Sequence, residues 1–172
     1  KRTLRDIYDD ETKNIIIEGN EGYLKAKNFM KIIMPKDVKK IKKYRDKIPL
    51  FFKEKIDQKL NDIFETQVKL SSGGYLVINP TEALVSIDVN SARSTKGKDI
   101  ESTAFATNIE AAKEIARQLR LRDLGGLIVI DFIDMQDEKH QIKVENTFKT
   151  SIQSDRARIQ IAGISRFGLL EL

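Results

Sequence analysis

Apolar residues recur with helical spacing in three long segments of the chain. In residues 22–34 and 48–64 they return every three or four positions, as they do in an amphipathic helix. Residues 99–122 show the same character over a greater length, and Asp99 is a candidate N-cap. Shorter helices are expected at residues 3–10, 36–44 and 137–153.

Apolar runs and strict alternation predict strands between these helices. Residues 14–19 and 126–135 are largely apolar, as in buried strands, whereas residues 83–90 alternate. Further short strands are expected at residues 67–70, 75–79 and 158–165. Because strands and helices alternate in the second half, we expect an α/β fold with a mixed sheet flanked by helices. An α+β arrangement is the alternative.

Alternation along the strand at 83–90 separates its side chains by chemistry. Its valine and isoleucine residues share one face, and Ser86, Asp88 and Asn90 share the other. A carboxylate and an amide two residues apart on one face can together hold a cation or the water molecules around it. Asp88 and Asn90 are therefore candidate site residues.

Asp131 interrupts the apolar strand predicted at 126–135. A charge in such a position costs free energy unless it is paired, hydrogen-bonded or bound to a metal. Ligands in α/β sheets collect at the carboxyl ends of strands, so Asp88 and Asp131 would form an oxygen-rich Mg²⁺ site if they met there. The alternatives are an Asp88–arginine pair and a turn capped by Asp131. Asp134 is a weaker candidate, since alternation points it to the opposite face.

Composition narrows the chemistry that such a site can use. The chain has no Cys, which excludes disulfides, thiolate catalysis and cysteine-based zinc sites. Its single His, His140, excludes multi-histidine metal sites and lies in a polar stretch where we expect no chemical role. Catalysis would therefore rest on carboxylates, amides, hydroxyls and cations. The absence of Cys and of any apolar run of about 18–20 residues favours a cytoplasmic protein without a membrane span.

Positive charge is concentrated in the first part of the chain. Residues 1–64 carry 17 Lys or Arg against 11 Asp or Glu, whereas residues 65–172 carry 14 against 15. This change predicts two domains, 1–64 and 65–172. A basic surface attracts phosphate backbones, although a lysine-rich helix face exposed to solvent explains the same pattern.

Further candidate residues follow the two aspartates along the chain. Arg93, Lys96 and Lys98 lie in the loop after Asn90, where cations would suit a phosphodiester. A basic surface loop is the alternative. Arg158 belongs to a second basic pair, and arginine binds both phosphate and carboxylate. Phe167 could stack on a base, but a contact with the core or a turn is the simpler expectation.

Three segments resemble the catalytic region of the ribonuclease E/G family. They are IDVNSARSTKGKDIESTAF (87–105), AAKEIARQLRLRDLGGLIVIDFIDM (111–135) and DRARIQIAGISRFGLLEL (155–172). The resemblance is specific from about residue 72 onward, and residues 1–64 look like the preceding part of the same region. It implies a partial RNase H-like subdomain over 1–64 followed by a DNase I-like catalytic subdomain over 65–172.

The resemblance also implies a function. Members of this family are Mg²⁺-dependent endoribonucleases that cleave single-stranded RNA to 5′-phosphate and 3′-hydroxyl ends, in rRNA processing and mRNA decay; Mn²⁺ is an alternative ion. By position, the two metal-binding aspartates fall on Asp88 and Asp131, and the supporting asparagine falls on Asn90. An arginine that helps to hold the RNA 5′-monophosphate falls on Arg158. The first three are the residues already selected from strand faces and burial.

Some family features have no counterpart here. The S1 domain and most of the 5′-sensing domain would precede Lys1, and the cysteine pair that shares a zinc between protomers would follow Leu172. We therefore expect a fragment with little or no activity alone, and a homo-oligomer is left open. A non-catalytic RNA-binding or scaffold module is the main alternative, and it would bind RNA without regard to Mg²⁺ or Asp131. A different metal phosphoesterase would usually need more His or carboxylate ligands.

Overall fold

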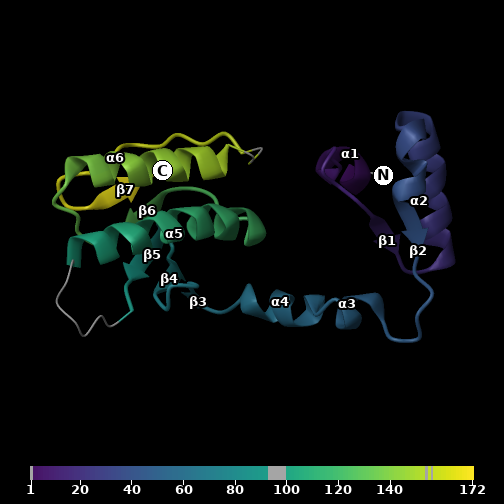
Figure 1. Ribbon diagram of the computed structural model, residues 1–172, viewed down its shortest axis with the longest axis horizontal. Coiled ribbons are helices and arrows are strands. Elements are labelled where there is room, and N and C mark those ends of the chain that lie inside the picture. Colours follow the sequence, from purple (N-terminus) through teal and green to yellow (C-terminus); the bar gives the residue numbers. More distant parts are fainter. Residues whose placement is uncertain (1, 93–99, 154, 156) are drawn as a thin grey trace. The chain divides into compact units, whose positions relative to one another are not determined.

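Two units divide the chain, an N-terminal unit of Lys1–Leu60 and a C-terminal unit of Asn61–Leu172. The computed structural model describes residues 2–92, 100–153, 155 and 157–172 (Figure 1). Asp99, the candidate N-cap, lies outside the described residues, as do Arg93, Lys96 and Lys98. Within the described residues, no helix is both long enough and apolar enough to cross a membrane.

The N-terminal unit combines short helices with a two-stranded parallel sheet. Its elements are α1 (Arg2–Ile7), β1 (Ile15–Ile17), α2 (Asn20–Ile33), the 3₁₀ helix η1 (Pro35–Lys40), β2 (Ile41–Lys43) and α3 (Leu50–Lys53). The strand expected at 14–19 and the helix expected at 22–34 are confirmed. The basic helix expected at 36–44 is a 3₁₀ helix that ends at Lys40, and the prediction was wrong beyond that residue. Residues 41–43 instead pair with β1, and Ile41 is buried, because tertiary pairing overrides a weak local preference.

The helix expected at 48–64 is two helices, α3 and α4 (Ile56–Asp62). Lys55 lies between them with a φ of +54°. A side-chain-bearing residue in this left-handed region interrupts the helical hydrogen bonding. Apolar spacing alone did not show this break.

A mixed five-stranded sheet organises the C-terminal unit, in the order β3–β4–β5–β6–β7. Its strands are β3 (Gln67–Lys69), β4 (Tyr75–Pro80), β5 (Val85–Asn90), β6 (Ile128–Asp131) and β7 (Leu169–Glu171). Among the strand pairs described in this sheet, β5–β6 is parallel and the other three are antiparallel. The expected α/β class and mixed sheet are confirmed.

Two helices, α5 (Ile100–Leu121) and α6 (Glu138–Ile152), lie side by side in this unit (Figure 1). Their buried residues form one core with the inward residues of the strands. The core includes Ile87 and Ile130 from the sheet, Ala111 from α5 and Phe148 from α6. The alternate positions of β5 and β6 are more exposed, so one face of the sheet meets the helices and the other is open.

The chain crosses from β5 through α5 to β6, which forms a β–α–β connection between neighbouring parallel strands. Such a connection brings the carboxyl ends of both strands to the same edge of the sheet. Asp137 caps α6 by accepting a hydrogen bond from the Lys139 amide at 2.8 Å. The helices expected at 99–122 and 137–153 thus match α5 and α6 within a residue or so.

The end of the chain differs from expectation. The strand expected at 126–135 is only Ile128–Asp131, and residues 158–165 form an isolated bridge through Ile164 instead of the predicted strand. Leu169–Glu171 pairs with β6 instead. The amides of Ala162 and Ser165 donate to the carbonyls of β7, so the predicted segment runs along the outer side of the last strand.

Candidate active site

Asp88 and Asp131 are direct partners in the parallel register of β5 and β6. Both residues are exposed, while their neighbours Ile87 and Ile130 are buried in the core. The two aspartates therefore lie on the open face of the sheet, on adjacent strands about 4.8 Å apart. The structure thus brings together two residues that are more than forty positions apart in the sequence.

The charge of Asp88 affects the ionisation of Asp131. The pKa of Asp131 is raised above its usual value, first by partial burial and then by the negative charges of Asp88 and Asp134. Burial and like charges both disfavour the ionised form of a carboxyl group. A cation bound between the strands would offset this repulsion.

Asn90 supports Asp88 from the same strand. Its Nδ2 donates a hydrogen bond to Asp88 Oδ2 at 2.8 Å. The two residues share the open face because they are two positions apart. This bond limits the rotation of the Asp88 carboxylate, so Asn90 orients one of the two acidic groups.

Asp134 belongs to the same acidic group, although sequence alternation placed it on the opposite face. Strand β6 ends at Asp131, so the alternation of side chains does not extend to residue 134. The negative charge of Asp134 contributes to the raised pKa of Asp131. A Cβ added at Gly168 would lie 3.3 Å from Asp134 Oδ1, so this carboxylate rests against the glycine. The acidic spacing D-x-x-D was the only sequence signal for its involvement.

A hydrated divalent cation fits this group of residues. Mg²⁺ is usually bound by one or two carboxylates and keeps several of its waters. Two carboxylates on adjacent strands, one of them oriented by an amide, supply that kind of ligand set. No group of three or more His, Cys, Asp or Glu suited to a metal occurs in the described part of the chain, so a cage made wholly of protein ligands is not what these residues offer.

The alternatives raised by the sequence do not match the contacts of the two aspartates. Among the residues that the structure describes, neither Asp88 nor Asp131 makes an ion pair with Lys or Arg. Asp88 accepts from Asn90 instead. Asp131 is the last residue of β6 and pairs across the sheet with Leu169.

Arg158 lies apart from the two aspartates. It lines a pocket of about 310 Å³ together with Gly125, Gly126 and Ile128. These residues precede or begin β6, whereas Asp131 ends it. The structure therefore brings together Asp88, Asn90 and Asp131, and it places Arg158 at the opposite end of the strand.

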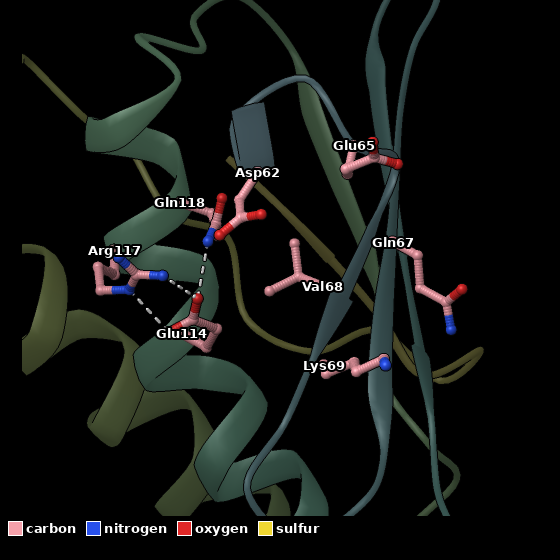
Figure 2. A pocket seen from close by; sticks show the side chains of 8 residues that line it. All are labelled: Asp62, Glu65, Gln67, Val68, Lys69, Glu114, Arg117 and Gln118. Atoms are coloured by element: carbon pink, nitrogen blue, oxygen red, sulfur yellow. Dashed lines mark hydrogen bonds and ion pairs between the residues drawn. The ribbon is translucent and has the colours of Figure 1, made fainter. Parts of the chain in front are cut away.

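A larger pocket, of about 590 Å³, lies between β3 and α5 (Figure 2). Glu114 accepts hydrogen bonds there from Arg117, at 2.7 and 2.9 Å, and from Gln118 at 2.7 Å. Burial would raise the pKa of Glu114, but these hydrogen bonds outweigh it and the pKa is lowered. Glu114 and Arg117 satisfy each other in this pocket, so the pair is a weaker candidate for binding a ligand than the carboxylates on the open face.

His140 has a structural role. Its Nδ1 lies 2.8 Å from Glu101 Oε1, and its ring stacks on Phe105 with 4.2 Å between the ring centroids. Glu101 also accepts hydrogen bonds from the amides of Gln136 and Asp137. His140 thus helps to join the start of α5 to the start of α6.

Comparison with known proteins gives a consistent result over the whole chain. Residues 1–172 match the model of the ribonuclease E/G family. Ribonuclease E of Haemophilus influenzae is 52% identical over 171 residues, which are 99% of this chain and 18% of that protein. Ribonuclease E of Escherichia coli K12 is 52% identical over 172 residues, which are 99% of this chain and 16% of that protein. Ribonuclease G of E. coli K12 is 37% identical over 172 residues, which are 100% of this chain and 35% of that protein.

Proposed function

The chain belongs to the ribonuclease E/G family, and we propose from this premise that its C-terminal unit carries a divalent-metal site for the cleavage of single-stranded RNA. One observation carries the proposal, namely the pairing of Asp88 with Asp131 on the open face of the sheet. The chain spans only 16%, 18% and 35% of the three relatives described above. The activity therefore belongs to a complete protein that contains this chain.

Each of the three residues has a separate task in this proposal. Asp88 and Asp131 hold one Mg²⁺, with Mn²⁺ as an alternative, and Asn90 keeps the Asp88 carboxylate oriented. Such an ion, when bound, lowers the pKa of its water and neutralises charge on phosphate oxygens. The open face leaves room for a single strand of RNA to approach both carboxylates. Hydrolysis at this site yields a 5′-phosphate and a 3′-hydroxyl.

Basic residues complete the proposed interface with RNA. Arg93, Lys96 and Lys98 follow Asn90 closely in the sequence and contact the phosphate backbone beside the metal. Arg158 binds a phosphate farther from the reacting bond, since it lies at the other end of β6. We assign to Arg158 the binding of the terminal 5′-monophosphate of the RNA.

The wider biological setting is part of the same proposal. We assign residues 1–64 to a partial RNase H-like subdomain and residues 65–172 to a DNase I-like catalytic subdomain. The complete protein acts in the cytoplasm in rRNA processing and mRNA decay. This chain contributes no cysteine to a zinc site, so any zinc ligands of that kind come from elsewhere in the complete protein.

Substitution of each aspartate tests the proposal. Asp88→Asn and Asp131→Asn, made in the complete protein, should each lower Mg²⁺-dependent cleavage of a labelled single-stranded oligonucleotide at least about 100-fold. Circular dichroism should show an unchanged fold, because both side chains are exposed. Glu82→Gln removes an exposed carboxylate from the same unit and should cleave normally. Cleavage at the wild-type rate by either aspartate variant would refute the assignment.

A non-catalytic RNA-binding module is the second candidate function. It is favoured by the excess of positive charge in residues 1–64, including the exposed Lys42 and Lys43 of β2. This alternative requires RNA binding that weakens steeply with salt and does not change with Mg²⁺ or with Asp131→Asn. Fluorescence anisotropy of a labelled RNA, measured with and without Mg²⁺ on the wild type and on Asp131→Asn, separates this alternative from the nuclease proposal.

A further inference from the structure

Phe167 exposes an aromatic ring to solvent in the turn before β7. The residue is 84% exposed and lies in a turn. Of the two contacts expected from the sequence, with the core or with a turn, the one with the core is not made. Phenylalanine is usually buried in folded proteins. An exposed aromatic side chain beside a proposed site for RNA therefore requires an explanation.

The backbone of Phe167 is tied to the segment that carries Asp131. Leu169, two residues after Phe167, is the register partner of Asp131 across β6 and β7. Between them, the Gly168 carbonyl accepts a hydrogen bond from the Phe132 amide at 3.4 Å. From the spacing of strands and the rise per residue, the backbones of Phe167 and Asp131 lie within about 10 Å of each other.

The turn that presents Phe167 is held by several hydrogen bonds. Ser165 Oγ accepts from the amides of Phe167 and Leu169, both at 3.3 Å, and the Ser165 carbonyl accepts from the Gly168 amide at 3.0 Å. Gly168 has a φ of +78°, and a side chain there would meet Asp134 Oδ1. The turn is thus shaped before any ligand binds, which lowers the entropy cost of ordering the ring on binding.

We propose that Phe167 stacks on one base of the single-stranded RNA, at a nucleotide next to the one cleaved at the carboxylates. Every base has a π face, so stacking on an exposed aromatic ring binds single strands with little dependence on sequence. Arg166 is exposed in the same turn, and its charge suits the neighbouring phosphate. This inference rests on the proposed function, because it assigns the substrate contact of that same site.

Three substitutions at Phe167 test the stacking. In the complete protein with Mg²⁺, Phe167→Ala should raise KM for a short single-stranded oligonucleotide roughly 5- to 150-fold, the range expected for one lost base–aromatic stack. Phe167→Leu stays apolar without a π system and should show a similar loss. Phe167→Tyr should restore most of the affinity. Thermal unfolding should be unchanged in all three, since the ring is exposed.

An abasic scan identifies the partner base. Oligonucleotides with one abasic nucleotide at successive positions are compared on the wild type and on Phe167→Ala. At one position near the cleaved bond, removal of the base should raise the KM of the wild type by the same factor as Phe167→Ala does. At that position, removal of the base should not raise the KM of Phe167→Ala any further. The proposal would be overturned if removal of the base and Phe167→Ala raised KM independently of each other at every position. It would also be overturned if Phe167→Ala and Phe167→Leu had the KM of the wild type.

Failure of the stacking and failure of the nuclease site give different results. If Asp131→Asn still cleaves RNA, the nuclease site is overturned. Fluorescence anisotropy of the same oligonucleotides on the wild type and on Phe167→Ala then decides whether Phe167 binds a base. A change in oligomeric state on Phe167→Ala, measured by light scattering, would overturn the stacking by showing that the ring packs against a second copy of the chain. The unchanged size of all three variants is the supporting outcome.

Discussion

Asn108 and Ile133 are joined by two reciprocal hydrogen bonds. Asn108 Nδ2 donates to the Ile133 carbonyl at 2.7 Å, and the Ile133 amide donates to Asn108 Oδ1 at 3.0 Å. The asparagine is fully buried on α5, and Ile133 lies between Asp131 and Asp134. The helix thereby holds the segment that carries two of the acidic residues at the open face, in a place where β6 has already ended and no strand pairing can do so.

Replacing Asn108 should destabilise the C-terminal unit. Asn108→Ala leaves the amide and the carbonyl of Ile133 without these partners in a buried place, and each such group costs about 1–3 kcal/mol. We expect the free energy of unfolding, measured by urea denaturation, to fall by about 2–5 kcal/mol. Asn146→Ala on the exposed side of α6 should change it by less than about 0.5 kcal/mol. Equal stability of the two variants would show that the Asn108 contacts contribute little.

Asn90→Ala should weaken metal binding without unfolding the protein. The substitution removes the 2.8 Å hydrogen bond that orients Asp88, and loss of such a supporting contact typically lowers metal affinity about 10- to 100-fold. Titration with Mn²⁺, followed by electron paramagnetic resonance, measures this directly. Asn79→Ala is the matched control, since Asn79 is an exposed asparagine on the neighbouring strand β4. Unaltered Mn²⁺ affinity in Asn90→Ala would argue against its orienting role.

Asp131→Asn should stabilise the metal-free protein slightly. The raised pKa of Asp131, caused by partial burial and by the charges of Asp88 and Asp134, means that ionisation of this group works against folding as pH rises. The gain should be below about 1 kcal/mol, present at neutral pH and absent below the usual aspartate pKa, where both states are protonated.

Thermal unfolding in EDTA between about pH 3 and 7 checks this stabilising effect. Adding Mg²⁺ should then raise the Tm of the wild type more than that of Asp131→Asn, because a ligand that binds only the folded state stabilises it. A lower Tm for Asp131→Asn in EDTA at neutral pH would contradict the repulsion between the carboxylates.

Glu101→Gln should show the opposite dependence on pH. The pKa of Glu101 is lowered by the hydrogen bond from the Gln136 amide, then by that of His140 and the Asp137 amide. The stability that these bonds contribute is therefore present above the usual glutamate pKa and is lost as pH falls through the lowered pKa. The variant should be less stable than the wild type at pH 7, and the difference measured by urea denaturation should shrink as pH falls below the usual glutamate pKa. Glu82→Gln, which removes an exposed carboxylate of the same unit, should be as stable as the wild type at pH 7. A stability difference for Glu101→Gln that does not change with pH would refute the ionic contribution.

Much of the candidate site could be predicted from the local sequence pattern. Alternation in 85–90 is enough to put Asp88 and Asn90 on one strand face, because side-chain direction in a strand depends only on position parity. The cost of a charge in an apolar run singled out Asp131. The position of Asp134 could not be predicted in this way, since alternation applies only as far as the strand extends, and β6 ends at Asp131.

Non-local pairing explains the elements that were wrong. Residues 41–43 form a strand because Ile15–Ile17 lies beside them, and Leu169–Glu171, not residues 158–165, completes the sheet on β6. Phe167 has the sequence of a core residue, yet its turn leaves the ring in solvent. For both strands the deciding contact comes from a distant segment, which a local pattern does not contain.

The amino-acid sequence by itself determined the family and the helices α5 and α6. It also determined that Asp88 and Asn90 share one face of β5 and that Asp131 follows an apolar run. Those features depend on composition and on the periodicity of neighbouring residues. Only the tertiary structure decided that Asp88 and Asp131 face each other, that Asp134 adds to their charge and that Arg158 lies at the far end of β6. Strand register, strand ends and turns are set by hydrogen bonds and packing between segments far apart in the chain, and these are properties of the folded state alone.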